Sequence, residues 1–241
     1  MNVKNQWLLM NIRGLYKTSL VDFPGRVSAV IFTGGCNLRC GYCHNPDLAL
    51  NSDTLEQIDD ETVFAFLNKR KGLLDGVTVS GGEPTLDREL IPFIRRVKST
   101  GFLVKLDTNG FYPSVVEQCL SENLLDYIAV DLKTSPVKYS SLTGCDVDFS
   151  KVKSTLDIIR SSGADYEIRT TCVPGFVEKG DITLIGESVG RVKNWFLQQF
   201  VNTNALLNPE AESISPYPVP YLEKMLDEVM KFADRASIRG V

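Results

Sequence analysis

Apolar runs that resemble strands alternate with stretches of helical period along most of the chain, and this alternation constrains the fold more than any other feature. The runs predicted as strands are residues 28–33, 76–80, 102–106, 127–130, 166–173 and 195–200. Helices are predicted over 59–71, from about 87 to 100, after Pro113, and around 152–162. Because each helix returns the chain to the same edge, five or six such units predict a parallel sheet in an α/β protein.

Polar or glycine-rich segments directly follow most of the predicted strands. They are residues 34–46, 80–84, 107–110, 131–133 and 173–175. The C-terminal ends of the strands meet at one rim in a β/α barrel, and that rim carries the active site. The sequence therefore predicts a single site built from these five segments.

The first of these segments contains Cys36, Cys40 and Cys43 in the spacing C-x3-C-x2-C. Three thiolates so close together can hold three irons of a 4Fe–4S cluster, whose usual protein ligand is cysteine sulfur. The sequence has no fourth cysteine nearby, so one iron would keep an open position for a substrate or cofactor. This favours a reaction centre over a cluster that only carries electrons.

Other uses of these thiols remain open. Zinc usually takes four ligands, often as paired C-x2-C motifs, and here only His44, the single histidine, could be the fourth. Chance clustering is a further alternative, whereas a disulfide framework is not expected in a chain this long without a secretory leader. Cys119, Cys145 and Cys172 are interpreted as packing or incidental thiols, with Cys145 the one to test for a further role.

Composition limits the class of protein. The 241 residues are predicted to form one domain over 1–241, with a core of about 12–200 and a peripheral segment 201–241 that starts with a long loop over 202–220. A net charge of −4 argues against a general nucleic-acid or membrane-surface binder. The N-terminal ten residues do not resemble a signal peptide, and no apolar stretch is long enough to cross a bilayer. We therefore expect a protein of the reducing cytoplasm.

Several motifs together resemble the radical S-adenosylmethionine (SAM) superfamily. They are the C-x3-C-x2-C spacing with Tyr42 before the last cysteine and the run Gly-Gly-Glu-Pro at 81–84. Within that superfamily the chain resembles the activating enzymes of glycyl-radical proteins, and most of all those of anaerobic ribonucleoside-triphosphate reductase. The runs that carry this narrower resemblance are 18–25, 43–46, 106–110, 131–133, 173–175 and 238–240.

The resemblance implies a fold, a reaction and partners. The fold would be a partial (β/α)6 TIM-like barrel of the radical SAM type. The enzyme would reductively cleave SAM at one 4Fe–4S cluster, and the resulting 5′-deoxyadenosyl radical would abstract hydrogen from a glycine of a partner, most of all anaerobic ribonucleoside-triphosphate reductase. A flavodoxin or ferredoxin would donate the electron. The alternatives are an activase of the pyruvate formate-lyase type, or a radical SAM enzyme acting on a small molecule, RNA or another peptide.

Two departures bear on these alternatives. Residues 46–73 contain no C-x2-C pair, which argues against a ferredoxin-like insert and for a single cluster. The pyruvate formate-lyase activase has a histidine-bearing segment late in its chain, and residues 208–220 contain no histidine. This weakens that assignment without excluding it.

The resemblance also implies roles for individual residues, with no catalytic group beyond the cluster and the SAM site. Cys36, Cys40 and Cys43 would bind the cluster. The SAM-binding residues would be Tyr42, Gly81, Gly82, Glu83, Asp107, Asn109, Asp131, Lys133 and Arg169. A monovalent cation would lie beside the SAM carboxylate on Asp107, Thr108 and Asp131.

More specific expectations follow for five of these positions. Tyr42 would pack on the adenine or simply shield the cluster, and Glu83 would face the SAM ammonium. Lys133 would pair with the SAM carboxylate. Arg169 would do the same or would form a structural ion pair inside the barrel. His44 would hydrogen-bond a cluster sulfur or neighbouring backbone.

Overall fold

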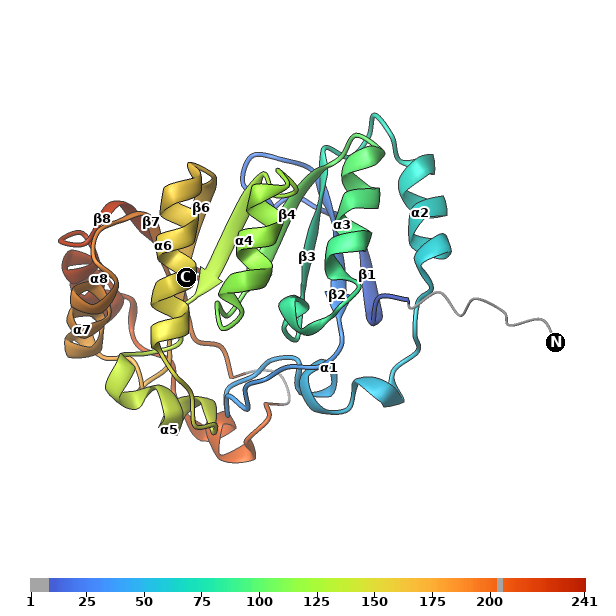
Figure 1. Cartoon of the computed structure of the whole chain (residues 1–241). Helices are drawn as coiled ribbons and strands as arrows, with labels where there is room; N and C mark the ends of the chain where they lie inside the picture. The colour runs from blue at the N-terminus through green and yellow to red at the C-terminus, as the bar shows by residue number, and fades with distance from the viewer. Residues whose placement is uncertain (1–8, 203–205) are drawn as a thin grey trace.

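A single sheet of eight strands, in the order β1 to β8, forms the centre of the molecule (Figure 1). The computed structural model describes residues 9–202 and 206–241. The strands are β1 Ile12–Ser19, β2 Ser28–Thr33, β3 Gly76–Gly81, β4 Leu103–Thr108, β5 Tyr127–Asp131, β6 Asp165–Cys172, β7 Val192–Gln199 and β8 Ala233–Arg239. Strand β1 is antiparallel to β2, and every later pair of neighbours is parallel. Since β1 and β8 do not pair with each other, the sheet is a partial barrel.

The six predicted strands correspond to β2–β7, so the predicted α/β partial barrel is confirmed. The sequence missed the two outer strands. Strand β1 forms a hairpin with β2, and β8 pairs with β7 from Val192 opposite Ala233 to Gln198 opposite Arg239. The sheet therefore continues beyond the predicted core of 12–200.

Helices cover the outer face of the sheet, where Figure 1 shows α3, α4 and α6 in front of the strands. The helices are α1 Pro46–Leu50, α2 Asp60–Lys69, α3 Leu90–Ser99, α4 Pro113–Ser121, α5 Tyr139–Thr143, α6 Ser150–Ser162, α7 Lys179–Val189 and α8 Val219–Val229. Within the predicted loop 202–220, Pro209–Ser213 forms a 3₁₀ helix, and residues 203–205 lie outside the described part.

Local sequence explains where these helices begin and end. The Asp59 side chain accepts a hydrogen bond of 2.8 Å from the Thr62 amide and caps α2, whose last turn carries Lys69. Helix α6 ends at Gly163, which has a φ of 72° that glycine adopts at little cost. The buried side chains of α3, such as Ile94 and Val97, pack towards the sheet.

The inner face of the sheet is polar. Along β4, Val104 and Leu106 are buried under the helices, whereas Lys105 and Asp107 point into the barrel. Parallel strands covered by apolar layers on both faces would read as continuous apolar runs, so this alternation marks an interior with different chemistry.

No helix in residues 9–202 and 206–241 is long and apolar enough to cross a membrane. The sequence prediction about a leader concerns mainly residues 1–8, which lie outside the described part.

Candidate functional site

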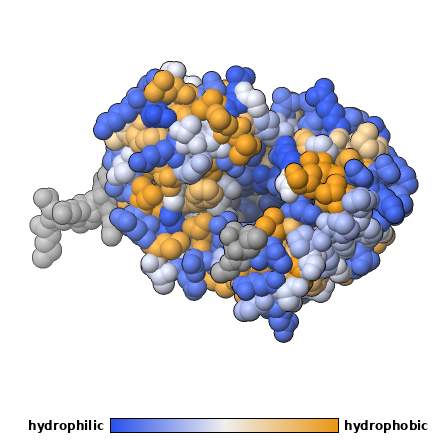
Figure 2. Space-filling view, turned by 180° about the vertical axis from the view of Figure 1, so that it is seen from behind, coloured by the Kyte–Doolittle hydropathy of each residue, from blue (hydrophilic) through white to orange (hydrophobic). Residues whose placement is uncertain are grey.

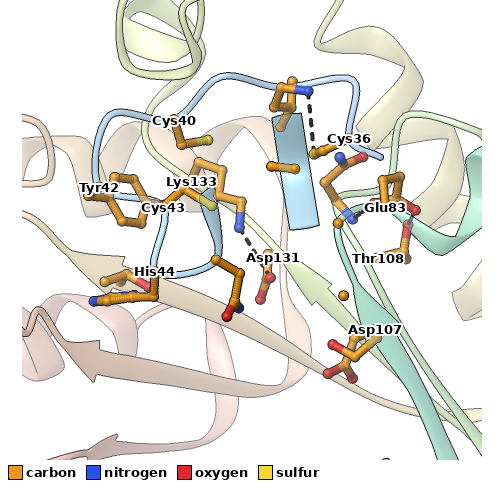
Figure 3. A pocket seen from close by; sticks show the side chains of 18 of the residues that line it. Cys36, Cys40, Tyr42, Cys43, His44, Glu83, Asp107, Thr108, Asp131 and Lys133 are labelled. Carbon is orange, nitrogen blue, oxygen red and sulfur yellow. Dashed lines mark hydrogen bonds and ion pairs between the residues drawn. The ribbon is translucent and has the colours of Figure 1, made fainter. Parts of the chain in front are cut away.

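A cavity of about 240 Å³ lies at the C-terminal ends of the parallel strands, beside the loop that carries the three cysteines (Figure 3). It is lined by Cys36, Leu38, Cys40, Tyr42, Cys43, His44, Asn45, Ala49, Ser80, Gly81, Gly82, Glu83, Asp107, Thr108, Asn109, Asp131, Lys133, Thr171 and Gln198. Every predicted site residue except Arg169 lines this cavity, and Arg169 contacts two residues that do. The structure thus brings the segments after β2, β3, β4 and β5 together, as the strand order requires, whereas the predicted segment 173–175 after β6 does not line this cavity.

Backbone hydrogen bonds shape the cysteine loop, residues 34–45. The Cys43 amide donates to the Cys40 carbonyl at 2.9 Å, which makes a turn between these two cysteines. The Arg39 amide donates to the Thr143 carbonyl at 2.7 Å and ties the loop to the end of α5. All six cysteines of the chain are free thiols. The loop therefore holds its three thiols beside the cavity without a disulfide.

Burial has the largest effect on the pKa of two of the thiols, and the Lys133 ammonium opposes it. Burial raises the pKa of the Cys40 thiol to about 12, and the Lys133 ammonium opposes that effect. Burial likewise raises the pKa of Cys36. An ammonium beside cysteine sulfur favours the thiolate form, which is the form that binds metal.

Two glycines allow the strand β3 to meet the cysteine loop. A Cβ at Gly82 would lie 2.0 Å from the Gly35 carbonyl oxygen, and a Cβ at Gly81 would lie 2.3 Å from the Thr33 amide nitrogen. Gly81 also has a φ of 123°, which side-chain-bearing residues rarely adopt. These glycines are needed for the close approach of backbone to backbone next to Cys36, whatever they also contact in a ligand.

Glu83 joins the ends of β3 and β4. It is buried, and its Oε1 accepts hydrogen bonds from the Thr85 hydroxyl and from the Thr108 hydroxyl at 2.7 Å. Its Oε2 accepts from the Asn109 amide at 2.7 Å. Burial raises the pKa of Glu83, and these hydrogen bonds oppose the effect. Contact between Glu83 and the SAM ammonium stays a prediction.

Asn109 in turn connects this corner to the cysteine loop, because its side-chain amide donates to the Asn37 Oδ1 at 2.7 Å. This hydrogen bond holds the end of β4 against the cysteine loop. Binding of SAM by Asn109 remains a prediction.

An ion-pair network lies beneath the cavity. Arg169 donates from Nε to Asp131 Oδ1 at 2.7 Å and from Nη1 to Asp107 Oδ2 at 3.2 Å. Lys133 donates to Asp131 Oδ2 at 3.1 Å, and Lys105 contacts Asp107 Oδ1. Burial alone would raise the pKa of Asp131, but Arg169 and Lys133 outweigh it and hold that pKa well below its usual range. Arg169 therefore makes an ion pair inside the barrel, which was one of the two roles expected for it.

Lys133 lies between this network and the cysteine loop (Figure 3). Burial alone would lower the pKa of Lys133. The Asp131 carboxylate has the opposite effect, and the pKa of Lys133 is raised well above its usual value. The nearby Tyr42 is buried, and its hydroxyl has no hydrogen-bond partner among the described residues. Burial raises the pKa of that hydroxyl, which stays neutral. The position of Tyr42 is compatible with both roles expected for it, shielding of the thiols and contact with an adenine.

Sequence reasoning missed some of the lining. Ser80 and Asn45 line the cavity within predicted segments, whereas Thr171 and Gln198 line it from β6 and β7. A single threonine or glutamine within a strand carries no chemical signal, so only their inward register could have indicated them. The predicted His44 contact is with backbone, because its Nε2 lies 2.8 Å from the Val201 carbonyl oxygen.

The remaining cysteines differ in their surroundings. Cys119 and Cys172 are wholly buried, as expected for packing thiols. Cys145 is partly exposed, and its Sγ lies 3.4 Å from the Asn37 carbonyl oxygen in the cysteine loop.

The residues present fit the group that the sequence predicts. Three free thiols lie at one side of the cavity, and Lys133, the lysine that lines it, is paired with the Asp131 carboxylate. Among the described residues, no three Cys, His, Asp or Glu side chains converge as ligands of a single metal ion would. Cysteine sulfur is the usual protein ligand of a 4Fe–4S cluster, whose ligands are spread over several metals.

Comparison with known proteins gives consistent results. The sequence profile of the radical SAM superfamily matches residues 30–182. A protein of Methanocaldococcus jannaschii, provisionally named a glycyl-radical enzyme activating enzyme, is 34% identical over 232 residues, which are 93% of this chain and 92% of the relative. The pyruvate formate-lyase 1-activating enzyme of Escherichia coli K12 is 32% identical over 172 residues, 67% of each chain.

Solved structures share the fold. A domain of a pyruvate-formate lyase-activating enzyme from Bacteroides vulgatus superposes with a TM-score of 0.55 at 20% identity, over 68% of this chain and 99% of that one. SuiB of Streptococcus suis, solved with S-adenosylmethionine, superposes with a TM-score of 0.65 at 16% identity, over 86% of this chain and 48% of that one.

Proposed function

This chain belongs to the radical SAM superfamily, and we propose that it is an activating enzyme that generates a glycyl radical on a partner protein. It is an enzyme of the radical SAM type, and its cofactors are a 4Fe–4S cluster and S-adenosylmethionine. The observation that carries the proposal is that its similarity to a glycyl-radical activating enzyme extends over nearly the whole of both chains.

The residues of the site have separate tasks in this proposal. Cys36, Cys40 and Cys43 hold the cluster at the rim. When bound, the reduced cluster supplies the electron that splits SAM into methionine and a 5′-deoxyadenosyl radical. Lys133 and Arg169 supply positive charge towards the SAM carboxylate, and both ion-pair with Asp131, which fixes their positions.

The open side of the barrel supports a macromolecular substrate. Strands β1 and β8 are unpaired with each other, and Figure 2 shows the surface hollowed at its centre, with hydrophilic residues inside, on the side opposite to helices α3 and α4. A loop of a partner protein that carries the reacting glycine enters from this side in the proposal.

Anaerobic ribonucleoside-triphosphate reductase is the partner that we propose, on the overall resemblance of residues 12–200 and of the run 238–240 to the activating enzymes of that reductase. Pyruvate formate-lyase is the second candidate, because an activating enzyme named for it is 32% identical over two thirds of the chain. A flavodoxin or ferredoxin is the proposed electron donor.

The test uses the cluster-loaded protein under anaerobic conditions. It is mixed with SAM, a strong reductant and, in parallel, each of the two candidate partners, and the EPR spectrum and the yield of 5′-deoxyadenosine are recorded. A glycyl doublet with one partner identifies it. Deoxyadenosine without a doublet from either partner would contradict the activase proposal and leave a radical SAM enzyme with another substrate.

A cysteine variant tests the assignment of the site. Cys40→Ala removes one of three cluster ligands, and we expect loss of the cluster absorbance and of the glycyl doublet. Cys119→Ala is the matched control, because it removes a buried thiol of α4, outside the cavity. A Cys40→Ala protein that still forms the partner's radical would refute the assignment.

A further inference from the structure

The carboxylates of Asp107 and Asp131 have no oxygen left without a cationic partner. Lys105 contacts Asp107 Oδ1, and Arg169 donates to Asp107 Oδ2 and to Asp131 Oδ1. Lys133 donates to Asp131 Oδ2. Three cationic side chains thus surround these two carboxylates.

The third oxygen donor expected for a monovalent cation is also engaged. The Thr108 hydroxyl donates to Glu83 Oε1 at 2.7 Å and accepts from the Gly110 amide at 3.1 Å. A hard cation needs several oxygen ligands directed at one point. Here such an ion would have to displace the contacts that the two carboxylates already make with Lys105, Arg169 and Lys133.

Lys105 is the unusual member of this group. Its side chain is 1% exposed, and Asp107 is the hydrogen-bond partner of its ammonium in the described structure. Lys105 and Asp107 are two residues apart on β4, so both side chains point into the barrel and the ammonium reaches the carboxylate directly. A buried lysine is costly unless it is paired, and this geometry supplies the pair.

We propose that the Lys105 ammonium takes the place of the monovalent cation, so that SAM binds to this protein without a requirement for K⁺ or Na⁺. An ammonium is a compact single positive charge, and it differs from a bound K⁺ mainly in being covalently attached. Its position beneath Asp107 leaves Lys133, which lines the cavity, to face the ligand. The inference concerns the SAM site alone and does not depend on which protein receives the radical.

The first test measures SAM affinity of the wild-type, cluster-loaded protein by calorimetry. Titrations are made at equal ionic strength in KCl, NaCl and tetramethylammonium chloride, the last of which has a cation too large for the site. We expect the dissociation constant to differ by less than about twofold among the salts, a free-energy change of only a few tenths of a kcal/mol. A dissociation constant that is tenfold lower in KCl would overturn the proposal.

The second test removes the charge. Lys105→Met keeps the length of the side chain but leaves Asp107 Oδ1 without its partner. We expect SAM to bind about tenfold more weakly to this variant in tetramethylammonium chloride, the loss typical of one charge-assisted contact, and KCl to restore most of the affinity. A variant whose affinity is equally low, or equally high, in both salts would contradict the proposal.

Lys98→Met is the matched control, since Lys98 also pairs with an aspartate, Asp126, but outside the cavity. We expect no dependence of its SAM affinity on the salt. If Lys105→Met fails to fold, thallium NMR of the wild type decides the question, because ²⁰⁵Tl⁺ substitutes for K⁺. Absence of a site-bound thallium signal supports the proposal, and a signal that SAM shifts refutes it.

Discussion

The two faces of the sheet have opposite chemistry, although the same strands make both. On the outer face, Leu106 and Ile168 are wholly buried under helices. On the inner face, their neighbours Asp107 and Arg169 form an ion pair at 3.2 Å. The outer face is stabilised by loss of apolar surface from water, whereas the inner face depends on each charge having its partner.

Residues on the outer face contribute to stability alone, whereas residues on the inner face contribute to both stability and the site. A residue on the outer face acts on the site only through the fold, because the strand backbone lies between its side chain and the cavity. A residue on the inner face acts on both, because the network beneath the cavity also holds the strands β4, β5 and β6 together. The predictions below change one face at a time.

The largest loss of stability is expected for Arg169→Met on the inner face. Among the described residues, Arg169 is the one side chain that contacts both Asp107 and Asp131. Methionine fills similar volume but leaves two buried carboxylates short of a partner, which typically costs about 3–5 kcal/mol. Urea unfolding of the cluster-free protein measures this, and calorimetry should show weakened SAM binding as well. A loss below 1 kcal/mol would mean that the inner charges are solvated.

Leu106→Ala on the outer face tests the other side of the same strand. The variant leaves a cavity under the helices, which typically costs about 2–5 kcal/mol of unfolding free energy. We expect the dissociation constant of SAM to change by less than about twofold, because no atom of the cavity is touched. A large change in SAM affinity would show that the two faces are not independent.

The pattern of inner and outer residues was only partly predictable. Strands β2–β7 were found because their outer positions are apolar, and the rim was found because cysteines, glycines and aspartates follow the strand ends. The run Ala-Asp-Arg-Ala-Ser-Ile-Arg of β8 was missed, since an edge strand with polar side chains on both faces has no apolar pattern to detect.

Lys105 shows a second limit of the sequence. Lys105 lies inside a predicted strand, and the sequence does not show which carboxylate would neutralise its charge. Because Asp107 was expected beside SAM and a monovalent cation, it was not paired with Lys105. Only the register of β4 and the burial of the ammonium reveal the pair.

Acid should lower the free energy of unfolding through the carboxylates of the inner face, because the outer face is held by apolar contacts that do not titrate. The pKa values of Asp107 and Asp131 are lowered in the folded state, where burial is outweighed by Arg169 together with Lys105 or Lys133. The unfolded chain therefore binds protons first as the pH falls below about 5, and stability declines by up to about 1.4 kcal/mol per pH unit for each carboxylate. Urea midpoints between pH 7 and 4 measure the slope.

The matched variant for this pH series is Asp131→Asn, which removes one of the two titrating groups. We expect a shallower decline of stability with acid than in the wild type, on a lower starting value. An identical slope in both proteins would assign the acid sensitivity to other carboxylates.

The smallest effect is expected at the floor of the barrel, one layer below the network. Arg239 of β8 donates to both oxygens of the buried Glu167 at 2.9 Å, and its guanidinium lies 3.5 Å from the Phe196 ring centroid. Glu167 also accepts from the Tyr127 hydroxyl at 3.1 Å, and the Arg239 side chain is 37% exposed, so water can replace part of the lost contact. Arg239→Met should therefore cost only about 1–2 kcal/mol, measured by urea unfolding.

Arg239→Met tests whether the inner face has two independent layers, one that contains Glu167 and Arg239 and one that contains Arg169. Glu167 precedes Arg169 by two residues on β6, and both point inward, but only Arg169 contacts residues that line the cavity. We expect SAM affinity to be unchanged in Arg239→Met, as in the control Arg235→Met, whose side chain is exposed on the same strand. If Arg239→Met weakened SAM binding as strongly as Arg169→Met, the charges of the barrel would act as one unit, and β8 would belong to the site as well as to the sheet.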